Sequence, residues 1–368
     1  MADKSSRSAA PAMVDQTSEK KLRIGLIGAG AIGQTYCEVL ADSATAQLVG
    51  VVDVRPEAAE AAAEATHCRA FRDIESLIHS AQPNAAVVCT PPATHADLCM
   101  ELAEHGVHIL CEKPLALDLT SAGRMFDAAE QNGVILTMAS KFRHVADMAQ
   151  ARAIIASRTL GDIVLFENVF AQHVEMGDRW NSDPAIGGGG VLIDNGTHSV
   201  DIMRYLLGPL AELQVIEGKR TQRLPVEETV RVFVRTTDDV LGSIDLSWSI
   251  HKLMPAYVSI YGTLGTLEIG WQESRYRRLT DDDWTSFGHG YSKLRAFHRQ
   301  VDNFTRALSG EEKLLVQPDD AIASVAVIEA AYRALKASAW EPVDDHGTRP
   351  DVIVPSNGKT VNVIGVAS

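Results

Sequence analysis

An aspartate and a histidine follow a run of four glycines, residues 187–190, at positions 194 and 198. The apolar pattern around them predicts a helix over residues 191–207, and residues four apart lie on the same face of a helix. Asp194 and His198 would therefore present an acid and a base side by side. Such a pair can move a proton to or from a reacting group.

The same helix face carries Asp201 and Tyr205, while most other positions of the segment are apolar. A narrow polar strip on an apolar helix predicts that the strip faces a cleft rather than bulk water. Gly196 lies inside the helix at a cost of roughly 1 kcal/mol relative to alanine, and glycines allow close approach of the backbone to a ligand. Two interpretations stay open, a catalytic face and a buried polar strip of structural origin.

The first part of the chain alternates short apolar runs with amphipathic segments of helical length. The expected strands are residues 22–27, 48–53, 84–89, 107–111 and 134–138, and the expected helices are 31–42, 56–65, 73–79, 94–105 and 118–131. Strands that are apolar throughout and alternate with helices predict a parallel sheet covered on both faces, the doubly wound Rossmann arrangement of an α/β protein.

After about residue 140 the pattern changes to a predicted helix at 145–157 and then long alternating runs. The expected strands are residues 163–170, 229–236, 240–250 and 256–261, with late helices at 290–308 and 318–338 that cover this sheet or return to the first domain. The runs lack helices between them and contain turn signals, which predicts an open, mostly antiparallel sheet in an α+β domain. We expect domains at 21–141 and 142–356, a disordered tail at 1–20 and a C-terminal tail at 357–368.

Composition places limits on function. The chain has 368 residues, 46% apolar and 22% charged, and its net charge of −14 disfavours nucleic acid and anionic membranes as partners. No apolar run is long enough to span a membrane, and the first twenty residues lack a signal-peptide core, so we expect a cytoplasmic protein. The histidines and cysteines show no zinc-type spacing, and we expect no metal.

A glycine-rich turn joins the first predicted strand to the first predicted helix. It reads Gly-Ala-Gly-Ala-Ile-Gly, and an acidic residue ends the second strand twenty residues later. In this context the pattern predicts a dinucleotide site, with the pyrophosphate at the helix N-terminus. The carboxylate favours NAD over NADP because a 2′-phosphate would meet a like charge, although Arg55 leaves dual use open. The predicted contacts are Gly28, Gly30, Ala31, Ile32, Gly33, Asp53 and Arg55.

Two further segments follow strand ends at the edge where such sheets bind ligands. One is residues 90–95, Thr-Pro-Pro-Ala-Thr-His, and the other is residues 112–114, Glu-Lys-Pro. Because the carboxyl ends of parallel strands meet at one edge, both segments would lie beside the nucleotide. The additional predicted cofactor contacts are Thr90, Pro91, His95, Glu112 and Lys113, although for Lys113 taken in isolation a surface lysine before a turn is the favoured interpretation.

The three motifs, in this order and at these distances, resemble the glucose-fructose oxidoreductase, inositol dehydrogenase and rhizopine catabolism (Gfo/Idh/MocA) family. The resemblance covers about residues 21–340. It implies that the first domain binds a nicotinamide cofactor and that the second presents an open sheet for substrate binding and assembly, as a homodimer or homotetramer. Family members commonly oxidise a secondary hydroxyl of a sugar, sugar derivative or cyclitol, which implies such a small-molecule substrate here.

The same resemblance implies roles for three residues. Lys113 would lie near the nicotinamide ribose and the reacting hydroxyl, and Asp194 and His198 would complete the site. Hydride transfer from an alcohol needs a base for the hydroxyl proton, for which His198 is the candidate. Asp194 would orient the substrate or the imidazole, and Lys113 would stabilise the developing alkoxide.

The chain departs from the family in one segment. Many members have an Asn-x-Arg-Phe/Tyr-like turn after the last strand of the first domain, where this sequence reads Ser-Lys-Phe-Arg at 140–143. The substrate contacts are therefore open, and each candidate has an equal structural interpretation. The candidates are Lys141, Arg143, His173, Arg179 and Trp180.

Three functions are compatible with these motifs. The first is an NAD-dependent dehydrogenase of a sugar or cyclitol. The second, also by resemblance, is a glycoside hydrolase that oxidises and re-reduces its substrate with tightly held NAD. The third is a redox sensor that binds the nucleotide without chemistry, which is less favoured because Lys113, Asp194 and His198 are all present.

Overall fold

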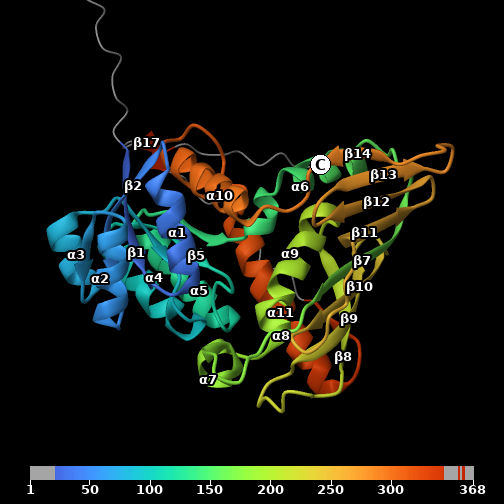
Figure 1. Cartoon of the computed structure of the whole chain (residues 1–368), viewed down its shortest axis with the longest axis horizontal. Coiled ribbons are helices and arrows are strands. Elements are labelled where there is room, and N and C mark those ends of the chain that lie inside the picture. Colours follow the sequence, from blue (N-terminus) through green and yellow to red (C-terminus); the bar gives the residue numbers. More distant parts are fainter. Residues whose placement is uncertain (1–20, 344–354, 357–358, 361–368) are drawn as a thin grey trace, which may run out of the picture.

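The computed structural model describes residues 21–343, 355–356 and 359–360. The predicted tail at 1–20 lies outside the described residues, as does the tail at 357–368 apart from residues 359–360. Two sheets dominate the described part, and helices α9 and α11 lie between them (Figure 1). The first sheet carries the glycine-rich turn, and the second is the larger sheet with one open face.

The first sheet has six parallel strands in the order β3-β2-β1-β4-β5-β6. This arrangement confirms the predicted parallel sheet. The three-residue β3 was missed because its sequence, Arg-Ala-Phe, is too short for a pattern and two of its residues are exposed. The strands are β1 Leu22–Ile27, β2 Ala46–Val52, β3 Arg69–Phe71, β4 Ala85–Val88, β5 His108–Glu112 and β6 Leu136–Ala139.

The helices of this region begin close to where the sequence predicts. Asp73 and Asp118 cap two of them, since their carboxylates accept hydrogen bonds from the amides of Ser76 at 2.8 Å and Ser121 at 2.7 Å. A short 3₁₀ turn, η1 Pro92–Thr94, precedes the fourth helix. The helices are α1 Ala31–Ala41, α2 Pro56–Ala65, α3 Ile74–Ala81, α4 His95–Glu104 and α5 Leu119–Gln131.

The second sheet has nine strands in the order β14-β13-β12-β11-β7-β10-β9-β8-β15. Its pairs are antiparallel except β7 with β10. Alternate residues of β9, such as Val230, Val232 and Val234, are buried, as expected for a sheet covered on one face. The strands are β7 Ile163–Ala171, β8 Leu210–Glu217, β9 Thr229–Thr236, β10 Leu241–Ser247, β11 Ala256–Gly262, β12 Gly265–Gly270, β13 Ser274–Arg278, β14 Thr285–Gly288 and β15 Glu341–Pro342.

The helices after β6 connect the two sheets. Helix α10 returns to the first sheet, because Phe297, Val301 and Phe304 pack into the same core as Tyr36 and Leu40 of α1. Helix α11 contributes residues to the cores on both sides. The remaining elements are η2 Lys141–His144, α6 Ala146–Ala156, η3 Trp180–Ser182, α7 Pro184–Gly187, α10 Lys293–Leu308, α11 Pro318–Ala337, β16 Pro355–Ser356 and β17 Lys359–Thr360.

The predicted helix at 191–207 is two helices, α8 Val191–Asp194 and α9 Gly196–Leu207, which meet at Asn195. The helical backbone bonds continue through the junction, from the Asn195 amide to the Val191 carbonyl at 2.9 Å and from the Ser199 amide to the Asn195 carbonyl at 3.2 Å. The junction therefore interrupts the expected single helix without reversing the chain. None of the helices in the described part is long and apolar enough to cross a membrane.

Candidate active site

The three glycines of the turn between β1 and α1 have three different environments. Gly28 has φ +100°, a left-handed conformation that favours glycine. A Cβ on Gly33 would lie 2.2 Å from the Gly28 carbonyl oxygen, so this position holds helix and strand close together. A Cβ on Gly30 would meet no atom within 4 Å, and no side chain caps the start of α1. Open space beside uncapped helix amides suits a phosphate group.

Asp53 lies directly against this turn. Its Oδ2 accepts a hydrogen bond from the Ala29 amide at 2.7 Å, and its Oδ1 accepts one from the Arg55 amide at 2.9 Å. Burial raises the pKa of Asp53, but hydrogen bonds from Arg55 and Ala29 outweigh burial, and the net pKa is lowered. The ionised carboxylate suits hydroxyl donors such as those of a ribose. Ala31 is exposed and Ile32 half-buried in the first turn of α1.

The structure corrects the assignment of His95 as a cofactor contact. The ring is fully buried, with Nδ1 2.9 Å from the Pro114 carbonyl oxygen and Nε2 2.9 Å from that of Thr90. His95 therefore links the loops that follow β4 and β5 and has no free ring nitrogen. Thr90 and Pro91 are half-buried at the end of β4, and the Thr90 hydroxyl accepts a hydrogen bond from Thr94 at 2.8 Å.

Glu112 turns toward α1 instead of standing free at the sheet edge. Its carboxylate accepts hydrogen bonds from the Tyr36 hydroxyl at 2.8 Å and the Lys113 amide at 3.1 Å. Burial raises the pKa of Glu112. The Tyr36 hydroxyl in turn accepts a hydrogen bond from the Gln300 side chain of α10 at 2.8 Å. Glu112 thus fixes the backbone before Lys113.

Lys113 and Asp194 meet across the interface between the two sheets. The lysine Nζ lies 2.6 Å from Asp194 Oδ1 and donates to the Asp194 carbonyl at 2.8 Å. The side chains keep 16% and 26% of their surface exposed, so the pair remains accessible to a ligand. The Lys113–Pro114 peptide bond is cis. The tertiary structure therefore joins two motifs that are 81 residues apart.

His198 lies one turn further along, with its ring against Phe142 at a centroid distance of 5.1 Å. Nδ1 is buried and has no hydrogen-bond partner in the described part of the chain. Burial lowers the pKa of His198 well below its usual value, and the charges of Lys113 and Lys141 add to this effect. The imidazole is therefore neutral, and Asp194 is paired with Lys113 rather than with His198.

The two other polar residues of the stripe have structural partners. Asp201 is 1% exposed and pairs with Arg143, with an Nη2–Oδ1 distance of 2.7 Å, and accepts a hydrogen bond from the Ser140 hydroxyl. The Tyr205 ring packs against the guanidinium groups of Arg143 and Arg152. This agrees with the structural interpretation for both residues.

The glycine run is required by packing rather than by a ligand. Gly188 has φ +80°, a Cβ on Gly189 would lie 1.8 Å from the Tyr332 hydroxyl, and a Cβ on Gly190 would lie 2.0 Å from the Glu227 carbonyl oxygen. The Glu227 carboxylate accepts hydrogen bonds from the Gly190 amide at 2.9 Å, the Leu192 amide at 3.0 Å and the Tyr332 hydroxyl at 2.8 Å. Packing against Glu227 and Tyr332 therefore accounts for glycine at residues 189 and 190.

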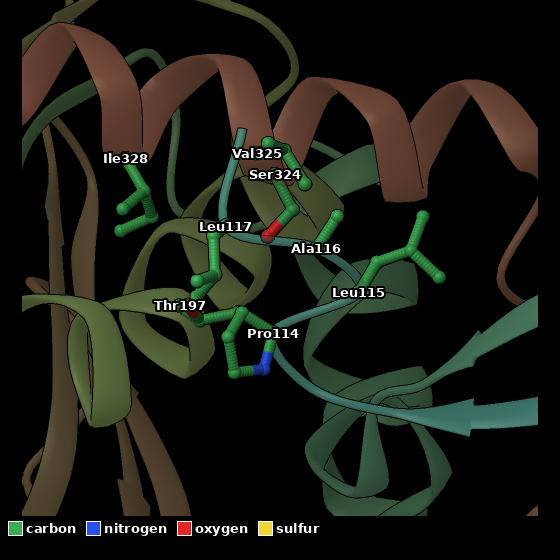
Figure 2. A pocket seen from close by; sticks show the side chains of 8 residues that line it. All are labelled: Pro114, Leu115, Ala116, Leu117, Thr197, Ser324, Val325 and Ile328. Atoms are coloured by element: carbon green, nitrogen blue, oxygen red, sulfur yellow. The ribbon is translucent and has the colours of Figure 1, made fainter. Parts of the chain in front are cut away.

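The loop after Lys113 is packed tightly between α9 and α11. Figure 2 shows Pro114, Ala116 and Leu117 of this loop facing Thr197 of α9 and Ser324 of α11. The cavity that they line is only about 10 Å³, barely the space of one water molecule. Close packing on both sides fixes the position of Lys113 relative to α8 and α9.

The structure corrects the assignment of Arg143 to substrate binding. Its guanidinium is 3% exposed and forms ion pairs with Asp201 at 2.7 Å and Asp320 at 2.8 Å. The buried guanidinium is thus held between α9 and α11. Arg179 and Trp180 are exposed in the segment before α7, and no contact joins them to Lys113 or Asp194 among the described residues. The same holds for His173, which is exposed and faces His251.

Two residues near the glycine-rich turn were missed by sequence reasoning. Tyr36 holds Glu112, and Lys293 of α10 donates to the Thr35 hydroxyl at 2.9 Å. No local signal marks Lys293, because 258 residues separate it from Thr35 and only the return of α10 to the first sheet joins them. Within the described ranges, no three His, Cys, Asp or Glu residues form a group that fits a metal ion.

Comparison with known proteins agrees with this geometry. Residues 22–140 match the model described as "Oxidoreductase family, NAD-binding Rossmann fold", and residues 148–268 match the "GFO/IDH/MocA C-terminal domain". The protein is thus an oxidoreductase with an NAD-binding domain. Because the two matches together span well over half of the sequence, the chain belongs to the Gfo/Idh/MocA family.

Relatives and solved structures extend over nearly all of the matched region. The rhizopine catabolism protein MocA of Rhizobium meliloti is 26% identical over 86% of this chain and 95% of its own length. The inositol 2-dehydrogenase of the same species (strain 1021) is 26% identical over 85% and 97%. Levoglucosan dehydrogenase, solved with NADH and levoglucosan, has the same fold, with a TM-score of 0.81, 21% identity and coverage of 88% of this chain and all of that one.

Proposed function

We propose that this protein is an NAD-dependent dehydrogenase that oxidises a secondary hydroxyl of a sugar, sugar derivative or cyclitol. The observation that carries the proposal is the accessible Lys113–Asp194 pair beside the neutral imidazole of His198. The Lys113 ammonium is a cation and the His198 imidazole is a proton acceptor, and the two lie together at the carboxyl edge of the first sheet. The names of two relatives, inositol 2-dehydrogenase and levoglucosan dehydrogenase, support this substrate class.

The chain's own residues account for the proton and charge movements of such a reaction. NAD held by the glycine-rich turn and Asp53 would supply the hydride acceptor for the carbon that carries the hydroxyl. His198 takes the hydroxyl proton, because its imidazole is neutral. Lys113 stabilises negative charge on the substrate oxygen, and Asp194 holds the lysine ammonium in place at 2.6 Å.

The nucleotide site supports NAD over NADP. The Asp53 carboxylate is ionised and lies on the glycine-rich turn, where a 2′-phosphate would meet a like charge. Arg55 does not remove this preference in the free protein, because its guanidinium already pairs with Asp53 at 3.2 Å. We therefore propose Gly28, Gly30, Gly33 and Asp53 as the principal cofactor contacts.

The direct test is reduction of NAD by the purified protein across a panel of hexoses, cyclitols, sugar acids and nucleotide sugars. Net formation of NADH with any of them is the expected result, and the same panel with NADP measures the role of Asp53. Release of an aglycone from glycosides without net NADH would instead identify the hydrolase. NADH binding with no turnover on either set would identify a sensor.

We further propose that the protein assembles as a homodimer or homotetramer through the open face of the second sheet. Leu165 of β7 pairs with Leu241 of β10 on that face, and the two side chains are 42% and 38% exposed. Neighbouring apolar side chains exposed on a broad sheet are a common basis for association between identical chains.

A further inference from the structure

Lys141 is one of the cations at the candidate active site. In the described part of the chain Lys113 pairs with Asp194, Arg143 pairs with Asp201 and Lys293 donates to the Thr35 hydroxyl. No hydrogen bond or ion pair joins Lys141 to another described residue. Its ammonium has only the Phe142 ring, at 5.4 Å from the centroid.

The position of Lys141 places it beside the reacting groups. It is the first residue of η2, two positions after the end of β6, so it lies at the same carboxyl edge as Lys113. The Phe142 ring beneath its ammonium also contacts the His198 ring, at 5.1 Å. The Lys141 charge also contributes to the lowered pKa of His198.

The charges around Lys141 leave its own charge poorly compensated. Burial, together with the charges of Lys113 and Lys293, lowers the pKa of Lys141 to about 8, although the charges of Glu112 and Asp194 oppose the shift. Both of those carboxylates are engaged elsewhere, Glu112 with the Tyr36 hydroxyl and Asp194 with Lys113. A partly buried ammonium without a counter-ion is costly, and an anionic ligand would remove that cost.

We propose that Lys141 forms an anion-binding subsite beside the reacting hydroxyl, and that the substrate is an acidic sugar or cyclitol derivative with a carboxylate or phosphate group. The proposal rests on the dehydrogenase function proposed above and narrows its substrate class. A lysine recognises such a group as a compact point charge with three donors and suits either anion.

The test measures binding and turnover separately. Calorimetry of the NADH complex compares hexuronates, aldonates and hexose phosphates with the parent neutral hexoses, and NAD reduction is assayed on the same set. We expect wild-type protein to favour one class of anion. Lys141→Gln should weaken binding and raise KM for that anion by about 10- to 100-fold, with less than twofold change in the Kd of neutral sugars, and Lys141→Arg should restore part of the affinity.

Two controls make the result specific. Lys336→Gln removes one exposed positive charge from the last turn of α11 and should leave anion affinity unchanged. The affinity for the anion, but not for neutral sugars, should fall above pH about 8, where Lys141 loses its proton.

Different results separate this proposal from the proposed function. Anion binding that depends on Lys141, without NAD reduction, would support the subsite and contradict the dehydrogenase. NAD reduction with no preference for anions would overturn the subsite alone. Equal losses for acidic and neutral sugars in Lys141→Gln, or a loss of NADH affinity instead, would also overturn it, because Lys141 would then serve the fold or the cofactor.

Discussion

The surroundings of His198 make its imidazolium form less stable than that of an ordinary surface histidine. The ring is 7% exposed, and two ammonium groups lie near it. These surroundings disfavour the imidazolium, so the neutral base is the stable form over a wide pH range. Lys113 and Asp194 neutralise one another beside it, and this leaves Lys141 to set the local positive charge.

Replacing His198 with asparagine should lower kcat by about 100- to 10,000-fold, the usual contribution of a general base. Asparagine keeps a polar side chain of similar size but cannot hold the proton. Steady-state kinetics on whichever substrate the panel identifies, together with NADH affinity as a check of folding, measures the effect. A loss of less than about tenfold at unchanged NADH affinity would assign the base to another residue.

The pH profile provides an independent measurement on the same residue. Because burial, Lys113 and Lys141 lower the pKa of His198 below 6.5, the basic form persists as pH falls through 6.5. Between pH 8 and 6.5, we expect no loss of kcat/KM from protonation of His198. The acidic limb of the kcat/KM profile should lie below pH 6.5. An acidic limb at or above 6.5 that disappears in His198→Asn would contradict this environment.

At the scale of elements, the start of α8 depends on contacts made by distant residues. Glu227 binds the amides of Gly190 and Leu192, and Tyr332 of α11 binds Glu227. These contacts occupy the space that side chains at residues 189 and 190 would need. Helix α8, and with it Asp194, is positioned by Glu227, which lies just before strand β9, and by helix α11, rather than by its own sequence alone.

Substituting Gly190 with alanine should destabilise the protein by about 1–3 kcal/mol, because the added methyl group meets the Glu227 backbone. Urea unfolding measures the change. Gly177→Ala is the matched control, since a Cβ there meets nothing within 4 Å, and its effect should stay within about 0.5 kcal/mol. Equal stabilities of the two variants would show that the glycine run at residues 187–190 can shift to accept a side chain.

At the scale of the whole molecule, the two sheets are joined by buried charges as well as by apolar packing. Arg143, just after the last strand of the first sheet, pairs with Asp201 of α9 and Asp320 of α11. Helix α10 crosses back to pack on α1. The proposed catalytic groups come from both sides of this junction, so its rigidity fixes the distance between Lys113 and Asp194.

Arg143→Met should cost about 3–5 kcal/mol of unfolding free energy, because it leaves Asp201 buried without its partner. The double variant with Asp201→Asn should recover part of the loss, since the uncompensated charge is removed. Arg333→Met is the control, because its exposed pairs at 3.9 Å contribute about 1 kcal/mol or less. Equal losses in the two single variants would contradict the role of Arg143.

The assembly is tested by the combined substitution Leu165→Glu and Leu241→Glu on the open sheet face. Light scattering should find a multiple of 39.8 kDa for the wild-type chain and a single chain for this variant, because two charges would enter the apolar contact. Leu279→Glu, at a position 76% exposed after β13, should leave the mass unchanged. A monomeric wild-type protein would overturn the proposal.

The sequence by itself determined the fold class, the family and the order of the motifs. These depend on local periodicity and on residues close together in the chain, such as the glycine-rich turn and Asp53. Residues 22–27, 56–65 and 229–236 are predicted with the bounds that the structure has. The short β3 and the junction at Asn195 were missed because no local pattern marks them.

The tertiary structure alone decided which candidates meet. Lys113 contacts Asp194, whereas His95 and Arg143 turn away to buried partners. The glycine run, which by sequence suggested a ligand, proved to make room for Glu227 and Tyr332. Contacts between residues tens or hundreds of positions apart depend on how the sheets and helices pack, and one linear sequence carries no local signal for that packing.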